Sequence, residues 1–233
     1  LPLVAIQKTG DLDPLNGTGP QVKPLPLLAV PPQVLAQADS RQSEADRLFN
    51  QGLQQFNTSQ YQAALESWQA ALVIYQEIGN RGREGDTLNA LGLLFKIAGQ
   101  PQTAIDLHQQ ALDIAREIND RTGEGNALGN LGSVYRSLNQ YDRAIDVYEQ
   151  VLAIFREVRD RAGEGATLGN LGVVYRNLGQ YQRAINHQEQ YLGIAREVGD
   201  RAGESIALGN LGSVYFTLGQ YERAIDLYEQ RLE

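Results

Sequence analysis

Apolar residues recur along most of the chain with the spacing that is typical of helices. Leu168, Leu171, Tyr175 and Leu178 lie three or four residues apart and so share one face of a helix. A second and broader apolar set follows Gly179; it comprises Ala184, Ile185, Gln188, Tyr191, Leu192, Ile194, Ala195 and Val198. The pattern predicts a helix pair whose second member packs both on its partner and on the next pair.

The same pattern repeats every 40 residues from Arg41 onward, without insertion or deletion. The units are 41–80, 81–120, 121–160, 161–200 and a shorter one, 201–233. Units 121–160 and 161–200 are identical at 26 of 40 positions. Repetition at this period predicts an all-α fold, a right-handed superhelical solenoid of antiparallel helix pairs.

Polar residues and glycines mark fixed positions in each unit. Asn80, Asp120, Asp160 and Asp200 precede the first helix, where their side chains can accept its free amide hydrogens. A glycine recurs inside that helix, at Gly52, Gly92, Gly132, Gly172 and Gly212. Glycine costs about 1 kcal/mol relative to alanine in a helix interior, so we expect it to let a neighbouring helix backbone approach closely. A Gly132→Leu change should overpack this contact.

Residues 1–40 differ from the repeats, because seven of the eight prolines lie between Pro2 and Pro32. Proline density of this kind predicts an extended segment. Residues 23–38 also resemble a secretory leader that ends in an Ala36-Gln37-Ala38 cleavage motif, although Pro26, Pro31 and Pro32 interrupt its apolar part. An extracytoplasmic location follows if this segment is the remnant of a leader, and a cytoplasmic one if it is not.

Composition and charge argue against several function classes. The 233 residues carry 28 acidic and 20 basic side chains, a net charge of −8, which disfavours nucleic acid as a partner. Cysteine is absent, and no apolar run reaches the ~20 residues of a membrane span. The two histidines, His108 and His187, occupy non-equivalent repeat positions and are predicted to be packing or surface residues. We therefore predict no metal, no cofactor, no catalytic residues and no enzyme activity.

The repeat motif resembles a known family. Leu168, Leu171-Gly172, Tyr175, Gly179, Tyr181 and Ala184 follow the pattern of the tetratricopeptide repeat (TPR). The Leu-Gly-Asn-Leu-Gly and Gly-Asp-Arg-Ala-Gly-Glu strings resemble the forty-residue repeats of the Pins/LGN scaffolds and of bacterial multi-repeat proteins, some of them joined to CHAT peptidase-like domains. The proline usual near the end of the second helix is replaced by Arg116, Arg156 and Arg196. The resemblance implies a protein–protein interaction scaffold whose first helices line a concave groove.

A second stripe on the first helix of each unit lies opposite its apolar face. In one unit it contains Asn170, Val173 and Asn177, and the asparagine recurs as Asn50, Asn130 and Asn210. An amide both donates and accepts hydrogen bonds, so such a ladder can hold the backbone of an extended peptide. The resemblance to peptide-binding TPR domains implies the same use.

Basic residues flank this ladder at Lys96, Arg136 and Arg176, where they can bind carboxylates. Apolar groups such as Val173 share the wall, so the predicted partner is a protein or peptide with acidic and hydrophobic residues. Duplication of a single unit also explains the recurrence of surface Asn and Arg residues, and exposed charges contribute little energy in general.

Three functions fit this reading. The first is a scaffold or adaptor that binds a peptide segment in the groove. The second is a regulatory or sensing arm of a larger enzyme, such as a CHAT-type peptidase. The third is self-association through the last unit, whose Ala224, Ile225, Tyr228 and Leu232 are expected to be exposed without a capping helix.

Overall fold

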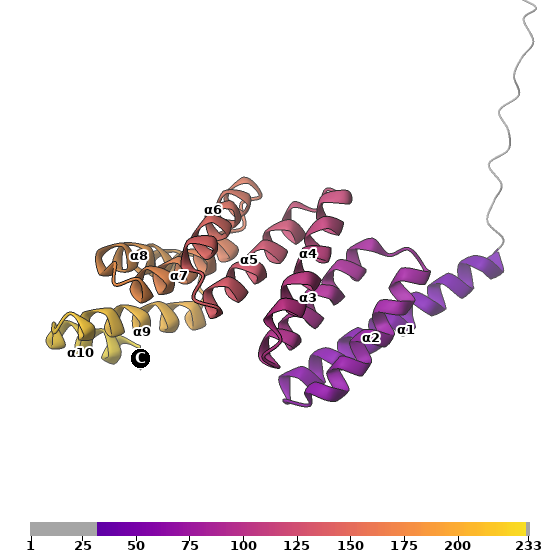
Figure 1. Ribbon diagram of the computed structural model, residues 1–233, viewed down its shortest axis with the longest axis horizontal. Helices are drawn as coiled ribbons and strands as arrows, with labels where there is room; N and C mark the ends of the chain where they lie inside the picture. Colours follow the sequence, from indigo (N-terminus) through magenta and orange to yellow (C-terminus); the bar gives the residue numbers. More distant parts are fainter. Residues whose placement is uncertain (1–31, 232–233) are drawn as a thin grey trace, which may run out of the picture.

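Ten helices follow one another in antiparallel pairs in the computed structural model, which describes residues 32–231 (Figure 1). They are α1 (Pro32–Asn57), α2 (Tyr61–Glu77), α3 (Arg81–Ile97), α4 (Pro101–Glu117), α5 (Arg121–Ser137), α6 (Tyr141–Glu157), α7 (Arg161–Asn177), α8 (Tyr181–Val198), α9 (Arg201–Thr217) and α10 (Tyr221–Gln230). Residues 32–231 contain no strand. The predicted all-α helical-repeat solenoid is confirmed.

The predicted capping residues begin the odd-numbered helices α3, α5, α7 and α9. The Asp160 carboxylate accepts a hydrogen bond from the Gly163 amide at 2.9 Å, and the Asn80 side chain accepts one from the Arg83 amide at 3.1 Å. Asp120 and Asp200 make the same contact. These bonds satisfy amides that the helix itself leaves free, and so they set the register at which each repeat starts.

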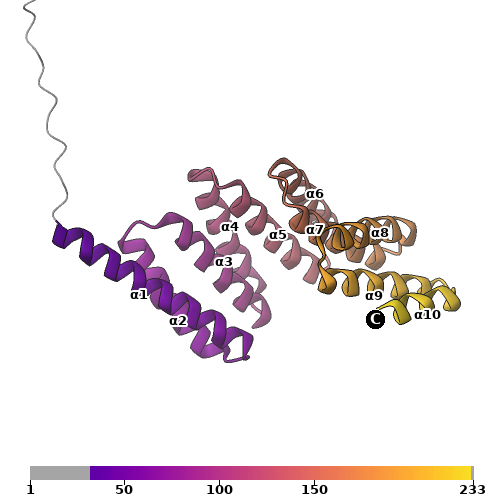
Figure 2. The same ribbon diagram turned by 180° about the vertical axis from the view of Figure 1, so that it is seen from behind.

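The helix pairs stack in sequence order from α1–α2 to α9–α10, as both views show (Figure 2). Packed contacts between neighbouring repeats join α3 to α5, α5 to α7 and α7 to α9, and none as extensive joins two even-numbered helices in the described chain. The odd-numbered helices therefore lie closer together than the even-numbered ones. The array therefore curves so that the odd-numbered helices lie on its concave side, where they form the inner wall.

The recurring glycine makes room for a side chain, not for a backbone as expected. A Cβ atom on Gly132 would lie 2.7 Å from the Tyr148 ring, and one on Gly212 would lie 2.6 Å from the Tyr228 ring. The residues that fill this space from the even-numbered helices are Trp68, His108, Tyr148, Gln188 and Tyr228. The expectation of close backbone approach was wrong, because the volume that glycine frees is taken up by these long side chains.

Arginines and glutamates link each repeat to the next. Glu164 is buried and accepts a hydrogen bond from Arg161 of its own helix. It accepts a second one, at 2.8 Å, from Arg156 of the preceding repeat. Arg161 also pairs with Glu197 of α8 at 2.5 Å. Arg116 and Arg196 contact Glu124 and Glu204 in the same way as Arg156 contacts Glu164. The residues found in place of the family's usual proline therefore tie adjacent repeats together.

Residues 32–40 correct the prediction for the N-terminal segment. They were expected to be extended with the rest of 1–40, but α1 begins at Pro32. Proline is tolerated in the first turn of a helix, where its missing amide hydrogen has no helical partner, and no further proline follows until Pro101. The Ala36-Gln37-Ala38 motif lies within this helix. The prediction for residues 1–31 lies outside the described residues.

The last helix pair differs in part from the expected exposed end. Ala224 is buried, whereas Ile225 and Tyr228 are exposed. Leu232 lies outside the described residues. Ala224 is the buried residue of α10, which packs against its partner helix α9.

Candidate functional site

The predicted asparagine ladder lies on the odd-numbered helices, at different degrees of burial. Asn130, Asn170 and Asn210 are half-buried on α5, α7 and α9, whereas Asn50 is exposed on α1. The Asn130 amide donates to Asn89 Oδ1, and the Asn210 amide donates to Gln188 Oε1, both at a long 3.4 Å. Asn170 makes no side-chain hydrogen bond with any described residue. The side-chain oxygens of the three half-buried members thus remain open to a donor.

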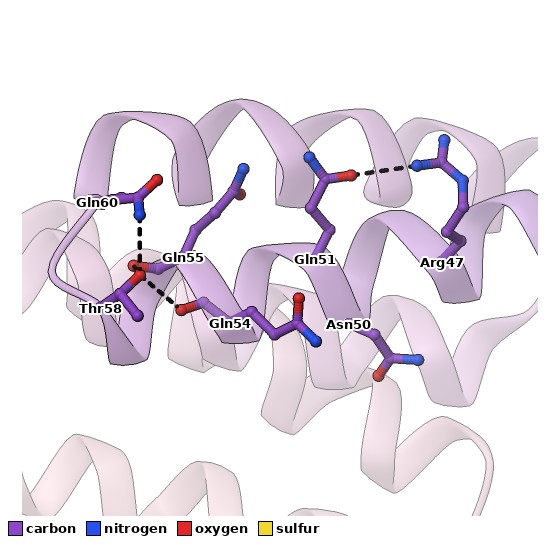
Figure 3. A pocket seen from close by; sticks show the side chains of 7 residues that line it. All are labelled: Arg47, Asn50, Gln51, Gln54, Gln55, Thr58 and Gln60. Atoms are coloured by element: carbon purple, nitrogen blue, oxygen red, sulfur yellow. Dashed lines mark hydrogen bonds between the residues drawn. The ribbon is translucent and has the colours of Figure 1, made fainter.

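Asn50 borders a separate polar hollow on α1 and the turn that follows it, which was not predicted from the sequence (Figure 3). The hollow is lined by Arg47, Asn50, Gln51, Gln54, Gln55, Thr58 and Gln60. Arg47 donates to Gln51 at 3.1 Å, and Thr58 donates to the Gln54 backbone oxygen at 2.9 Å. The glutamine-rich stretch 51–60 was the available signal in the sequence. The first repeat therefore presents a different surface from the later ones.

The predicted basic residues are half-buried near the ends of α3, α5 and α7. Lys96 donates to the Ser133 hydroxyl at 2.5 Å, and Arg176 donates to the Ser213 hydroxyl at 3.3 Å. Burial, and then the charge of Arg136, lower the pKa of Lys96. None of the three cations pairs with a carboxylate of the described chain, whereas nine other arginines do. These charges are therefore available to an anion from outside.

Arg136 differs from its two neighbours in the row. Ser133 and Ser213 occupy equivalent positions in their repeats, and the residue at this position on α7 is Val173. Its side chain is half-buried and cannot accept a hydrogen bond. The Nε atom of Arg136 is buried without a hydrogen-bond partner in the described protein. Asn177, the last predicted residue of the wall, is exposed at the end of α7.

A hollow of about 290 Å³ lies between α5 and α7 and brings two ladder residues together. Its lining includes Gly129, Asn130, Ser133, Tyr148, Asp160 and Asn170. The hollow one repeat earlier is only about 10 Å³, and Asn89 lines it at the position that Gly129 has in the larger one. The carboxylate of Asp160 is engaged in capping α7.

The two histidines lie apart, one in the core and one at its edge. His108 is buried, and its Nδ1 atom lies 3.0 Å from Asn89 Oδ1. Burial, together with the nearby Lys96 charge, lowers the pKa of His108 to about 4. His187 stacks on Tyr175 with ring centres 5.2 Å apart, and burial lowers its pKa as well. Both are packing residues.

Residues 32–231 contain no cluster of three or more side chains suited to hold a metal ion. Across the same described range, no helix combines the length and apolar character that a bilayer crossing requires.

A family model decides the relationship of this chain to known proteins. The model for the tetratricopeptide repeat matches residues 43–117, 87–157, 123–197 and 163–233. The chain belongs to the tetratricopeptide repeat family. The matches together cover residues 43–233, while the boundaries of the single units stay a prediction. The narrower resemblance to Pins/LGN repeats stays a prediction.

Solved structures share the TPR fold at low sequence identity. BtubC (BKLC) from P. vanneervenii is 21% identical with a TM-score of 0.68, covering 85% of this chain and 88% of that one. The nearly identical TPR-like repeats of a putative kinesin light chain from Podosopora anserina are 21% identical with a TM-score of 0.65, covering 82% and 94%. No curated protein matches the chain.

A Rap protein complexed with competence and sporulation factor is 16% identical with a TM-score of 0.74. The alignment covers 81% of this chain and 53% of the Rap protein, so the chain spans about half the length of that relative. These likenesses establish the fold. Together with the family match, they support a protein–protein interaction scaffold in general terms.

Proposed function

We propose that this TPR array binds an extended segment of a partner protein along the inner wall formed by α5, α7 and α9. The observation that carries the proposal is the row of half-buried asparagines, Asn130, Asn170 and Asn210, at one register on three adjacent helices. Their open oxygens and weakly engaged amides match the donors and acceptors of a peptide backbone. The fold supports this use, because the odd-numbered helices form the inner wall.

Charge and apolar groups on the same wall define the partner further. Lys96, Arg136 and Arg176 form a cationic row without carboxylate partners in the described chain, on a protein of net charge −8. The half-buried Val173 and the exposed Leu53 add apolar contacts. The segment that fits carries acidic and hydrophobic side chains.

One of the solved structures of similar fold is that of a complex. The Rap protein of similar fold forms a complex with competence and sporulation factor. At 16% identity, we carry over from it only that an array of this fold can hold a bound factor.

The test is selection of a displayed random-peptide library against the 233-residue chain, followed by fluorescence polarisation with the selected peptides. Replacing Asn130, Asn170 and Asn210 by Ala should weaken binding by about 1–3 kcal/mol or more. The matched control replaces Gln110, Gln150 and Gln190, three exposed amides on even-numbered helices, and should leave binding unchanged.

Equal binding by the asparagine variant would exclude the ladder from the binding surface. Failure to select any peptide would contradict the scaffold proposal and favour the two other functions, a regulatory arm or self-association. Light scattering of the same samples separates these two, because self-association through Ile225 and Tyr228 raises the mass with concentration.

A further inference from the structure

The contact between α5 and α7 lacks polar pairs that the adjacent contacts possess. On either side of it, Lys96 donates to Ser133, and Arg176 donates to Ser213. At α5–α7 the cation is Arg136 and the residue at the acceptor position is Val173, so the buried Nε of Arg136 has no partner in the described protein. Buried polar groups are paired as a rule, so a buried guanidinium nitrogen without a partner needs an explanation.

A second buried group without a partner lies beside Arg136. Tyr148 reaches from α6 across Gly132, is 1% exposed, and lines the hollow between α5 and α7. Its hydroxyl makes no hydrogen bond within the described chain. Burial raises the pKa of Tyr148, while the charge of Arg136 and the nearby Arg136 and Ser133 side chains oppose that rise.

Residues equivalent to Tyr148 are paired in other repeats. Trp68 donates to the Phe49 backbone oxygen at 3.1 Å, and Gln188 donates to the Gly169 backbone oxygen at 2.8 Å. His108 contacts Asn89. Tyr228, at the same position of the last repeat, also makes no hydrogen bond in the described chain, but it is exposed. Tyr148 is therefore the buried residue at this position whose polar atom lacks a partner.

The hollow has room for a side chain, and Tyr148 lines it whereas Arg136 lies outside its lining. Its volume of about 290 Å³ far exceeds the roughly 10–15 Å³ that one water molecule needs. Asn170 on its far wall adds an amide with no hydrogen-bond partner among the described residues. The one carboxylate in its lining, Asp160, is held by the Gly163 amide.

We propose that the hollow between α5 and α7 is the anchor site for an acidic side chain, Glu or Asp, of the bound segment. Arg136 supplies the charge, and Tyr148 and Asn170 supply neutral donors, which together match a carboxylate. Arg136 does not line the hollow, so it reaches the ligand by turning its long side chain, a rotamer change common at interfaces. The same turn exposes the neighbouring Tyr148 hydroxyl. This inference rests on the proposed function and assigns its acidic contact to one repeat pair.

The chain itself offers two variants that remove the site with little risk to folding. Val173→Ser gives Arg136 the hydroxyl partner that Lys96 and Arg176 already have. Gly129→Asn places in the hollow the residue that occupies the equivalent space one repeat earlier. A Cβ on Gly129 meets nothing within 4 Å, so α5 can accept the substitution.

The test titrates N-acetylglutamate N-methylamide, at millimolar concentrations, into the isotope-labelled 233-residue chain and follows its amide signals by NMR. The Gly129 backbone amide and the Asn130 and Asn170 side-chain amides should shift. The glutamine analogue should bind at least about tenfold more weakly, since a hydrogen bond to a charged group is worth about 1.5–3 kcal/mol. Arg136→Ala and Gly129→Asn should abolish the response, and Val173→Ser should weaken it.

Equal responses to the two compounds, or no shift at these amides, would overturn the anchor site. Library-selected peptides separate this failure from that of the proposed function. If they bind, but replacing their acidic residue by its amide costs the same affinity in the parent chain and in Gly129→Asn, the groove stands and the anchor is wrong. If no peptide binds and the glutamate compound still shifts these amides, the anchor stands without the groove.

Discussion

At the scale of single residues, one position per repeat decides how the core is filled. All five repeats have a glycine at the same position of the odd-numbered helix. The residue of the even-numbered helix that fills the space beside it varies, and is Trp68, His108, Tyr148, Gln188 or Tyr228. The absent Cβ leaves a slot wide enough for rings and amides of different size. What each repeat places there then decides whether its polar atom finds a partner.

Two glycines on α5 provide a matched pair for testing this slot. Gly132→Ala and Gly129→Ala gain the same helix propensity, but only the first brings a Cβ against the Tyr148 ring, at 2.7 Å. We expect Gly132→Ala to be less stable than Gly129→Ala by about 1–3 kcal/mol, the usual cost of overpacking. Urea unfolding followed by circular dichroism measures the difference. Equal midpoints would show that the Tyr148 ring moves aside freely.

His108 makes stability depend on pH. Unfolded histidine takes up a proton near pH 6.5, but burial holds the pKa of folded His108 at about 4, so the unfolded chain binds more protons between these values. Stability should therefore fall as the pH is lowered from 7 to 5. His108→Gln uses the residue found at Gln188 and should reduce that loss by about 1–2 kcal/mol. Thermal or urea unfolding at both pH values measures it, and identical pH dependence in the two proteins would contradict the buried neutral imidazole.

At the scale of elements, the ends of the helices carry the links between repeats. Glu164 in the first turn of α7 is buried between Arg161 of its own helix and Arg156 of α6. Both arginines lower the pKa of Glu164 and outweigh its burial, so the carboxylate stays charged. One glutamate thus joins the start of a repeat to the end of the previous one.

Glu164 and Glu197 allow a matched comparison of buried and exposed links. Both accept hydrogen bonds from Arg161, but Glu197 is exposed. Glu164→Gln should lower the free energy of unfolding by about 1–2 kcal/mol, because the charge is removed and one of the two arginines then faces an amide nitrogen that cannot accept its hydrogen bond. Glu197→Gln should change it little. Denaturant titration of the two variants tests this. Similar losses of stability in the two variants would contradict a special contribution of the buried Glu164 to the contact between repeats.

At the scale of the whole molecule, each helix pair contacts its neighbours only, as far as residues 32–231 show. Stability in such an array is close to a sum over repeats and their interfaces, and unfolding can start at one end. The central pair α5–α6 is covered on both sides, whereas Ala224 is the one buried residue of α10 in the described range.

Amide hydrogen exchange should therefore vary along the chain. We expect α9–α10 to exchange at least about tenfold faster than α5–α6, which corresponds to about 1.4 kcal/mol or more of difference in local opening. Exchange followed by mass spectrometry of proteolytic fragments gives the protection of each pair. Uniform protection would show instead that the array opens as one cooperative unit.

Much of this architecture follows from the sequence, because its signals are local and repeated. The forty-residue period, the capping Asp160 and the spacing of Leu168 and Leu171 depend on neighbouring positions along one helix. The start of α1 at Pro32 was missed, because proline density hides how well a proline fits a first turn. The asparagine ladder was predictable as a stripe, but its weak ties to Asn89 and Gln188 were not.

The sequence by itself determined the class of fold, the helix pairs and the register of the asparagines, since periodicity and capping act within about ten residues. Tertiary structure alone decided which polar groups are left without partners. Whether Arg136 finds an acceptor depends on Val173 of the next repeat, and whether a hollow opens depends on Gly129, Tyr148 and Asn170 from three different helices. Such pairing is a property of side chains that meet only when the repeats stack.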